Sequence, residues 1–204
     1  DAISDLPEIS VENFKKENNL NEKEIIALLP GSREQEVEKM LSLMLSVRDS
    51  FKNYQFVIAG APSLPKEFYQ KFVDDDVHFV SNKTYDLLRC SRAALVTSGT
   101  ATLETALLNV PEIVCYRTSK ISYEIGKRVV KNIKFISLVN LIMDKEVVKE
   151  LVQNQLNTEN LVDELQKILE GPKRDKMLQD YELLREKLGG KGASNHAAEI
   201  IVNL

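Results

Sequence analysis

Hydroxyl side chains gather around one glycine in the segment Thr97-Ser98-Gly99-Thr100-Ala101-Thr102. The small and branched apolar residues at 93–96 predict a buried parallel strand before this turn, and a helix is expected to begin near Ala101. A helix start presents free backbone N–H groups and a positive dipole end, which bind phosphate, and Gly99 would let the backbone come close to it. Glu104 lies about one turn into that helix, where its carboxylate can reach a sugar hydroxyl beside the phosphate.

The same residues also fit an ordinary capped helix. Ser or Thr is a common N-cap residue, and Glu104 would then complete a capping box. Helix starts are far more frequent than phosphate sites, so this window alone favours the capped helix. The rest of the chain reverses that preference.

A second turn with anion-binding character follows the apolar run at residues 25–29. Gly31-Ser32-Arg33 ends that run and precedes a helical pattern over 34–51. Arginine contacts phosphate in a bidentate manner, and a cation at a helix start otherwise opposes the helix dipole. Both facts favour a binding role for Arg33 over a merely exposed side chain. The turn is not a Walker A motif, and the chain has no Gly-x-Gly-x-x-Gly, which weakens a dinucleotide hypothesis.

Asn140 lies in the apolar segment Ser137-Leu138-Val139-Asn140-Leu141-Ile142. Its amide both donates and accepts hydrogen bonds, so it could read a base or a sugar; a turn-forming asparagine is an equal alternative. The sequence shows no Ser-His-Asp set, metal-ligand pattern or close carboxylate pair. The domain is therefore equipped to hold a phosphorylated ligand and poorly equipped to react with it.

Bulk properties describe an ordinary globular protein. The chain has 204 residues, of which 43% are hydrophobic and 28% charged, and no apolar run approaches the roughly 20 residues of a membrane span. No secretory signal is visible. Cys90 and Cys115 have no Cys or His neighbours, which predicts buried thiols, and the isolated His78 and His196 receive no chemical role. The net charge of -4 argues against nucleic-acid binding.

Apolar runs and helical spacings alternate along the chain. Strands are expected at 25–29, 55–59, 77–80, 93–96, 112–116 and 135–138. Helices are expected at 11–17, 34–51, 66–73, 84–91, 101–108, 119–131, 145–153, 158–170, 173–188 and 194–203. This alternation predicts a doubly wound α/β domain with a mostly parallel six-stranded sheet, Rossmann-like in kind.

Ligands of such sheets bind beyond the carboxyl ends of the strands. The turns at Gly31, Gly60 and Gly99 and the Tyr116-Arg117 corner should all lie at that edge. Four polar, glycine-rich or basic turns at one edge favour a phosphate site. Residues 1–24 are expected to form a leading connection, 25–188 the ligand-binding domain, and 189–204 a flexible joint with a last helix.

Four motifs follow one another over about residues 24–170. They are Leu28-Leu29-Pro30-Gly31-Ser32-Arg33-x-x-Glu36, Thr97-Ser98-Gly99-Thr100-Ala101-Thr102-Leu103-Glu104, Tyr116-Arg117 and Ser137-Leu138-Val139-Asn140-Leu141. In order and spacing they resemble the carboxyl-terminal half of the lipid-A-disaccharide synthase family. The resemblance implies a GT-B glycosyltransferase with two Rossmann-like domains. Such an enzyme joins UDP-2,3-diacylglucosamine to 2,3-diacylglucosamine 1-phosphate with inversion at the anomeric carbon and releases UDP.

The resemblance also implies where UDP binds. The matching positions are Gly31, Ser32, Arg33, Ser98, Gly99, Thr100, Ala101, Thr102, Glu104 and Asn140. Arg33 would stabilise the leaving UDP. The catalytic base is expected in an amino-terminal acceptor domain, which we expect to lie outside this sequence. The chain alone should therefore bind nucleotide weakly and turn over little or nothing. No cofactor or metal is implied, because the UDP-sugar is a substrate.

Residues 117–134 carry one acid and six basic side chains, namely Arg117, Lys120, Lys127, Arg128, Lys131 and Lys134. With the resemblance in mind, Arg117, Lys127, Arg128 and Lys131 are candidates for contacts with the acceptor phosphate or anionic lipid headgroups. A solvated helix face is the equal alternative. The resemblance implies a cytoplasmic enzyme peripheral to the inner membrane, and it allows a homodimer.

Two other functions remain open from the sequence. One is another GT-B enzyme, such as a UDP-N-acetylglucosamine 2-epimerase or a MurG-like transferase. The other is a non-catalytic nucleotide-binding module, which would also explain phosphate turns without acid or base groups.

Overall fold

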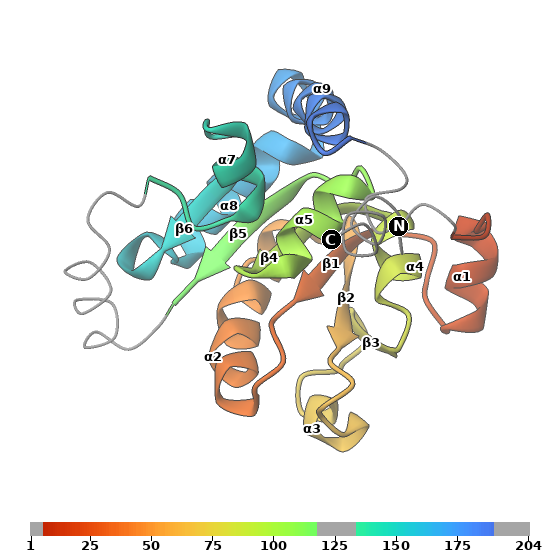
Figure 1. Ribbon diagram of the computed structural model, residues 1–204. Coiled ribbons are helices and arrows are strands. Elements are labelled where there is room, and N and C mark those ends of the chain that lie inside the picture. The colour runs from red at the N-terminus through yellow and green to blue at the C-terminus, as the bar shows by residue number, and fades with distance from the viewer. Residues whose placement is uncertain (1–5, 118–133, 190–204) are drawn as a thin grey trace, which may run out of the picture.

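The computed structural model describes residues 6–117 and 134–189, in which six strands form one sheet (Figure 1). The strands are β1 (Glu24–Leu29), β2 (Tyr54–Gly60), β3 (Val77–Ser81), β4 (Ser91–Thr97), β5 (Glu112–Tyr116) and β6 (Lys149–Val152). Their order across the sheet is β3-β2-β1-β4-β5-β6, and all neighbours run parallel. The predicted doubly wound α/β class is confirmed.

The central strands are apolar on both faces because helices cover both. Along β1, the side chains of Ile25, Ala27 and Leu29 pack into one hydrophobic cluster, and those of Ile26 and Leu28 into another. All five are buried. This two-sided cover explains the unbroken apolar run in the sequence, where a half-buried strand would show alternation.

The helices supply the rest of both clusters. Helices α2 (Glu34–Leu45), α3 (Lys66–Gln70), α8 (Thr158–Leu169) and α9 (Pro172–Lys187) bury side chains in the cluster that contains Ile26. Helices α1 (Val11–Glu17) and α4 (Thr84–Arg89) bury Phe14, Leu87 and Leu88 in the cluster that contains Ile25. Helix α5 (Thr100–Leu107) packs on β4 and β5, and beside it lies α7 (Leu138–Met143).

The sixth strand lies where the sequence predicts a helix. Strand β6 pairs with β5 from Ile113–Lys149 to Tyr116–Val152, so the strand predicted at 135–138 and the helix predicted at 145–153 are both wrong. Residues 138–143 form α7 instead, and its N-cap Ser137 accepts a hydrogen bond from the Asn140 backbone N–H. A short apolar run fits either element, and here the capping hydroxyl and the free edge of β5 decide.

Smaller corrections concern helix lengths. The helix predicted at 34–51 ends at Leu45 and is followed by the 3-10 helix η1 (Arg48–Ser50), and α3 ends at Gln70. A second 3-10 helix, η2 (Gln153–Gln155), follows β6. The helices predicted at 119–131 and 194–203 lie outside the described residues, as does most of the joint predicted at 189–192.

The sheet reverses its strand order between β1 and β4. Successive strands after β1 are added on one side of it, and those after β4 on the other. The connections diverge at such a point and leave a crevice beyond the carboxyl ends of the two strands. The turns that follow β1 and β4, which contain Gly31 and Gly99, lie at this crevice.

Candidate functional site

A cleft of about 310 Å³ opens at the crevice between the ends of β1, β2 and β4 and the start of α5. Its lining consists of Leu29, Gly31, Ser32, Glu36, Ala59, Gly60, Ala61, Pro62, Thr84, Thr97, Ser98, Gly99, Thr100 and Ala101. Six of the ten residues predicted to bind nucleotide are thus brought together: Gly31, Ser32, Ser98, Gly99, Thr100 and Ala101. The other four, Arg33, Thr102, Glu104 and Asn140, are not in the lining.

The turn after β1 forms one wall of the cleft. Gly31 has φ +106°, which favours glycine, and a Cβ there would lie 3.8 Å from Thr97 on β4. The Ser32 carbonyl accepts a hydrogen bond of 2.9 Å from the Ser63 hydroxyl. This wall is therefore tied to the turn that follows β2.

The turn after β2 also lines the cleft, although none of its residues is among those predicted to bind nucleotide. Gly60 allows a close approach of Phe79, because a Cβ at Gly60 would lie 2.3 Å from the Phe79 ring. Phe79 stacks on Tyr69, whose hydroxyl accepts a 3.0 Å hydrogen bond from the Ala61 N–H. The sequence did hold a signal for this wall, since Gly60-Ala61-Pro62 directly follows an apolar strand.

The turn after β4 forms the opposite wall. The Ser98 backbone N–H donates to the Cys115 carbonyl at 3.1 Å, and the Ser98 hydroxyl donates to the Ile136 carbonyl at 3.2 Å. Thr102 is fully buried, and its hydroxyl donates to the Gly99 carbonyl at 2.8 Å. Thr102 therefore stabilises the backbone of the turn and does not line the cleft.

Helix α5 begins without a side-chain cap. Its N-cap residue is Gly99, and no side-chain hydrogen bond caps its first turn. The capped-helix interpretation of this segment, with Ser or Thr as N-cap and Glu104 in a capping box, is therefore wrong. Thr100 and Ala101 line the cleft at the positive end of an eight-residue helix, which is an arrangement that attracts anions.

Arg33 stands at the mouth of this arrangement, outside the lining itself. Its side chain is 82% exposed and forms an ion pair of 3.2 Å with Glu36, which does line the cleft. An exposed ion pair of this kind contributes little to stability. The guanidinium is therefore free to exchange Glu36 for an anion in the cleft.

Glu104 lies one turn along α5 from the cleft. One carboxylate oxygen accepts a 3.0 Å hydrogen bond from the Tyr85 hydroxyl. Burial and this hydrogen bond to Glu104 raise the pKa of Tyr85, so the phenol stays protonated and keeps donating. Tyr85 follows Thr84, which lines the cleft, and this contact orients the carboxylate that was predicted to meet a sugar hydroxyl.

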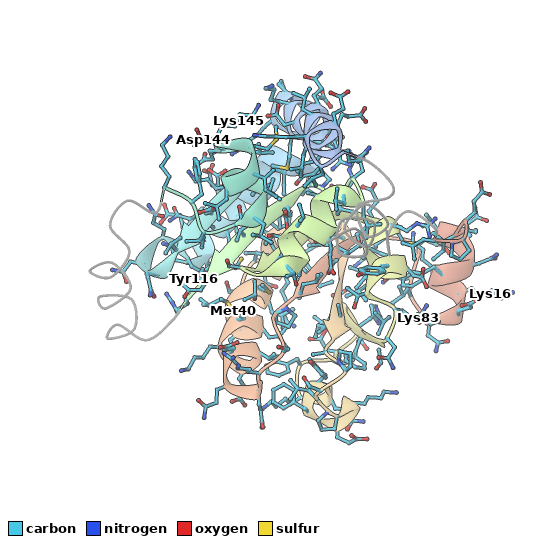
Figure 2. All side chains as sticks on the ribbon, viewed as in Figure 1. Lys16, Met40, Lys83, Tyr116, Asp144 and Lys145 are labelled. Carbon is cyan, nitrogen blue, oxygen red and sulfur yellow. The ribbon has the colours of Figure 1, made fainter. Side chains whose placement is uncertain are left out.

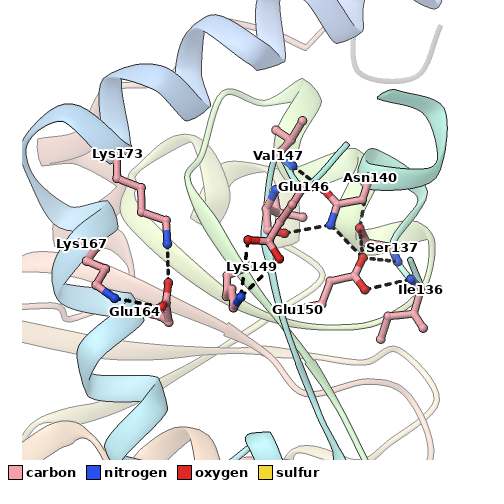
Figure 3. A network of polar contacts seen from close by, with 11 residues as sticks. Ile136, Ser137, Asn140, Glu146, Val147, Lys149, Glu150, Glu164, Lys167 and Lys173 are labelled. Atoms are coloured by element: carbon pink, nitrogen blue, oxygen red, sulfur yellow. Dashed lines mark hydrogen bonds and ion pairs between the residues drawn. The ribbon is translucent and has the colours of Figure 1, made fainter. Parts of the chain in front are cut away.

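Asn140 belongs to a closed network and not to the cleft (Figure 3). Its side chain is fully buried, and its Nδ2 donates to the Val148 carbonyl at 2.8 Å and to Glu150 at 2.9 Å. Its Oδ1 accepts from the N–H groups of Val147 and Val148 at 2.7 and 3.0 Å. The hydrogen-bonding groups of this amide are thus all paired with other parts of the chain. Asn140 lies within helix α7 and not in a turn, and its predicted contact with a base or a sugar stays a prediction.

The connection between α7 and β6 is also held by contacts with α9. Lys145, labelled in Figure 2, follows α7. Its ammonium group makes an ion pair of 2.9 Å with the buried carboxylate of Asp180 on α9. Lys176 contacts the same carboxylate at 2.9 Å. These contacts hold the connection between α7 and β6 in place.

The predicted basic surface is described only in part. The Arg117 guanidinium donates to the carbonyls of Gln153 and Leu156 at 3.2 and 3.0 Å, so it closes the end of β6. Lys127, Arg128 and Lys131 lie outside the described residues. No helix within 6–117 and 134–189 is long and apolar enough to cross a membrane.

The thiols are buried as predicted, and burial raises the pKa of Cys90 to about 11. Among the described residues, no group of three or more His, Cys, Asp or Glu side chains is placed to hold a metal ion.

A larger hollow of about 520 Å³ lies at the opposite edge of the sheet. Four of the charged side chains that line it form ion pairs with one another, Lys23 with Asp76 and Arg48 with Asp74. It also lies at the amino ends of β1 and β2, away from the reversal of strand order. The smaller cleft is therefore the better candidate, because its polar groups converge and face an uncapped helix.

Solved structures share this architecture. The glycotransferase of kitacinnamycin superposes with a TM-score of 0.61 at 10% identity, covering 89% of this chain and 43% of that one. The C-terminal CMP-Kdo binding domain of WaaA from Acinetobacter baumannii gives a TM-score of 0.52 at 13% identity, covering 86% of this chain and 96% of that one. The fold is that of a Rossmann-like domain of GT-B glycosyltransferases.

Sequence comparison identifies the family. A family model described as lipid-A-disaccharide synthetase matches residues 3–203. The lipid-A-disaccharide synthase of Syntrophus aciditrophicus is 40% identical over 188 residues, which are 88% of this chain and 49% of the relative. That of Persephonella marina is 34% identical over 206 residues, 95% and 54% of the two chains. The chain belongs to the lipid-A-disaccharide synthase family, and it spans about half the length of these relatives.

Proposed function

We propose that this chain is the UDP-sugar-binding part of a lipid-A-disaccharide synthase. The complete enzyme joins UDP-2,3-diacylglucosamine to 2,3-diacylglucosamine 1-phosphate, inverts the anomeric carbon and releases UDP. Family membership supports the reaction, and the names of the relatives support the product. The observation that carries the binding role is the cleft where Gly31, Ser98 and the uncapped start of α5 meet.

The proposed chemistry at this cleft is stabilisation of the leaving group. As the anomeric bond breaks, negative charge develops on the diphosphate of UDP. The positive end of α5 and the Arg33 guanidinium are preorganised charges of opposite sign. Glu104, held by Tyr85, would accept a hydrogen bond from a hydroxyl of the nucleotide sugar. No metal is needed for this neutralisation, and none is proposed.

The catalytic base is proposed to come from the other half of the enzyme. The cleft lining contains one carboxylate, Glu36, which is paired with Arg33 at the mouth. The chain by itself should therefore bind nucleotide and transfer little or no sugar. The complete enzyme would act at the cytoplasmic face of the inner membrane, where its acylated substrates reside.

Calorimetric titration with UDP, UMP and ATP tests the binding role. We expect UDP to bind more tightly than UMP, because the second phosphate adds contacts at the start of α5, and more tightly than ATP. A preference for ATP, or no heat of binding with millimolar UDP, would overturn the proposal.

A matched pair of variants locates the site. Thr100→Glu places a carboxylate at the exposed first residue of α5 and should abolish UDP binding by charge repulsion. Thr158→Glu makes the same change at the exposed first residue of α8 and should leave the affinity unchanged.

A further inference from the structure

Glu150, on β6, accepts four hydrogen bonds although it lies outside the cleft (Figure 3). One carboxylate oxygen accepts from the Ser137 N–H at 2.9 Å, the Ser137 hydroxyl at 2.8 Å and the Asn140 amide at 2.9 Å. The other accepts from the Ile136 N–H at 2.9 Å. Hydrogen bonds to a carboxylate are about twice as strong as neutral ones, so residues 136 and 137 are firmly held.

Ile136 connects this network to the cleft. Its N–H donates to Glu150, and its carbonyl accepts the Ser98 hydroxyl at 3.2 Å. A single residue therefore separates the carboxylate from the turn that lines the cleft. Among the described side-chain contacts, the Ser98 hydroxyl makes this bond only. The position of the Ser98 side chain therefore depends on where Ile136 is held, while the Ser98 N–H and Thr102 hold the backbone of the turn.

We infer that Glu150 is a positioning residue for the nucleotide site. It fixes the Ile136 carbonyl, which tethers the Ser98 hydroxyl and thereby sets the backbone of residues 98–101 before an anion arrives. A turn that is already in its bound conformation binds more tightly, because less ordering is needed on binding. The inference rests on the proposed function only in its choice of UDP as the probe.

Double-mutant cycles test the proposed relay. Glu150→Gln replaces two acceptor oxygens by one oxygen and an amide that faces donors, and Ser98→Ala removes the tether directly. We expect each change to weaken UDP binding about fivefold to tenfold, and the double variant to bind no more weakly than the weaker single variant. If the two fold-changes multiply, the effects are independent and the relay is wrong.

A matched control comes from the same segment. Glu146 is an exposed carboxylate four residues before Glu150, and its side chain contacts Lys149 only among the described residues. Glu146→Gln should leave UDP affinity unchanged. If Glu150→Gln fails to fold, Ser137→Ala removes a single donor to the same oxygen and should weaken UDP binding in the same direction.

Hydrogen exchange of the ligand-free chain separates this inference from the proposed function. The Ser98 N–H donates to the Cys115 carbonyl, and we expect its exchange to accelerate at least tenfold in Glu150→Gln while α8 keeps its protection. Unchanged exchange at Ser98 would overturn the positioning role. If wild-type chain does not bind UDP but Ser98 exchange accelerates, the proposed function fails and the positioning role stands.

Discussion

Two polar clusters of this domain look alike in sequence and differ in what they can do. The cleft residues around Gly31 and Ser98 lie at turns that open beyond the strand ends, beside a helix start with no side-chain cap. The cluster of Ser137, Asn140 and Glu150 is closed, because its members bond to one another and to the main chain. Hydrogen-bonding groups that are already satisfied stabilise the fold, and groups with capacity left over can hold a ligand.

The largest expected effect comes from opening the closed cluster. Asn140→Ala would leave the N–H groups of Val147 and Val148 and the Val148 carbonyl buried without a partner. We expect the free energy of unfolding to fall by about 3 kcal/mol, since each unsatisfied buried group costs about 1–3 kcal/mol. Urea unfolding measures this loss.

The exposed Asn154 provides the control for that change. Asn154→Ala should alter the free energy of unfolding by no more than about 0.5 kcal/mol. Equal stabilities of the two variants would contradict the claim that the Asn140 network is closed.

A second test uses a buried polar group that belongs to neither cluster. Glu112 on β5 is fully buried, and neither carboxylate oxygen has a hydrogen-bond partner among the described residues. Burial raises the pKa of Glu112 well above its ordinary value. The folded state therefore binds this proton more tightly than the unfolded state, and stability decreases as the pH rises from the unfolded pKa to the folded pKa.

The variant Glu112→Met removes that proton linkage. The slope of stability against pH that one such group causes is about 1.4 kcal/mol per unit. We expect Glu112→Met to raise the free energy of unfolding by about 2 kcal/mol at pH 8 and by less at pH 5. Parallel stability curves for the two proteins between pH 5 and pH 8 would show that the carboxyl group finds a partner.

The next effect concerns ligand binding without a change in stability. Arg33→Ala should reduce the affinity for UDP about tenfold, or roughly 1.4 kcal/mol, because a charge-assisted hydrogen bond is lost. The thermal midpoint should stay nearly constant, since the side chain is 82% exposed. Arg48→Ala, at the opposite edge of the sheet, serves as the control, and equal losses of affinity would argue against a local contact.

The smallest expected effect tests whether positive electrostatic potential in the cleft favours UDP binding. Glu36→Gln removes the negative charge that lines the cleft beside Arg33 and should tighten UDP binding about twofold at low salt. The gain should disappear at high ionic strength, where exposed charges are screened. Weaker binding of UDP by this variant would instead indicate that Glu36 contacts the ligand directly.

The strands buried on both sides were predictable, because runs such as residues 25–29 and 93–96 are apolar throughout, contain small and branched side chains, and are followed directly by turn residues. Turn chemistry likewise located Gly31 and Gly99 at one edge of the sheet. The segment 135–153 was not predictable, because a four-residue strand and a six-residue helix leave patterns too short to tell apart. Tertiary contacts determine the secondary structure of this segment, because β6 pairs with the edge of β5 and Ser137 caps α7.

The sequence by itself determined the class of the fold, the edge where its polar turns collect, and a family resemblance that the comparisons confirm. Only the tertiary structure decided which polar residues face outward from that edge. Asn140 and Ser98 both follow apolar runs, yet they differ in their partners. The side chain of Asn140 makes all four of its hydrogen bonds to Val147, Val148 and Glu150, whereas Ser98 lines the cleft and its hydroxyl bonds to the Ile136 carbonyl. The local sequence determines which hydrogen bonds a side chain can make. The segments that pack around it in the tertiary structure determine which of those hydrogen bonds remain available to a ligand.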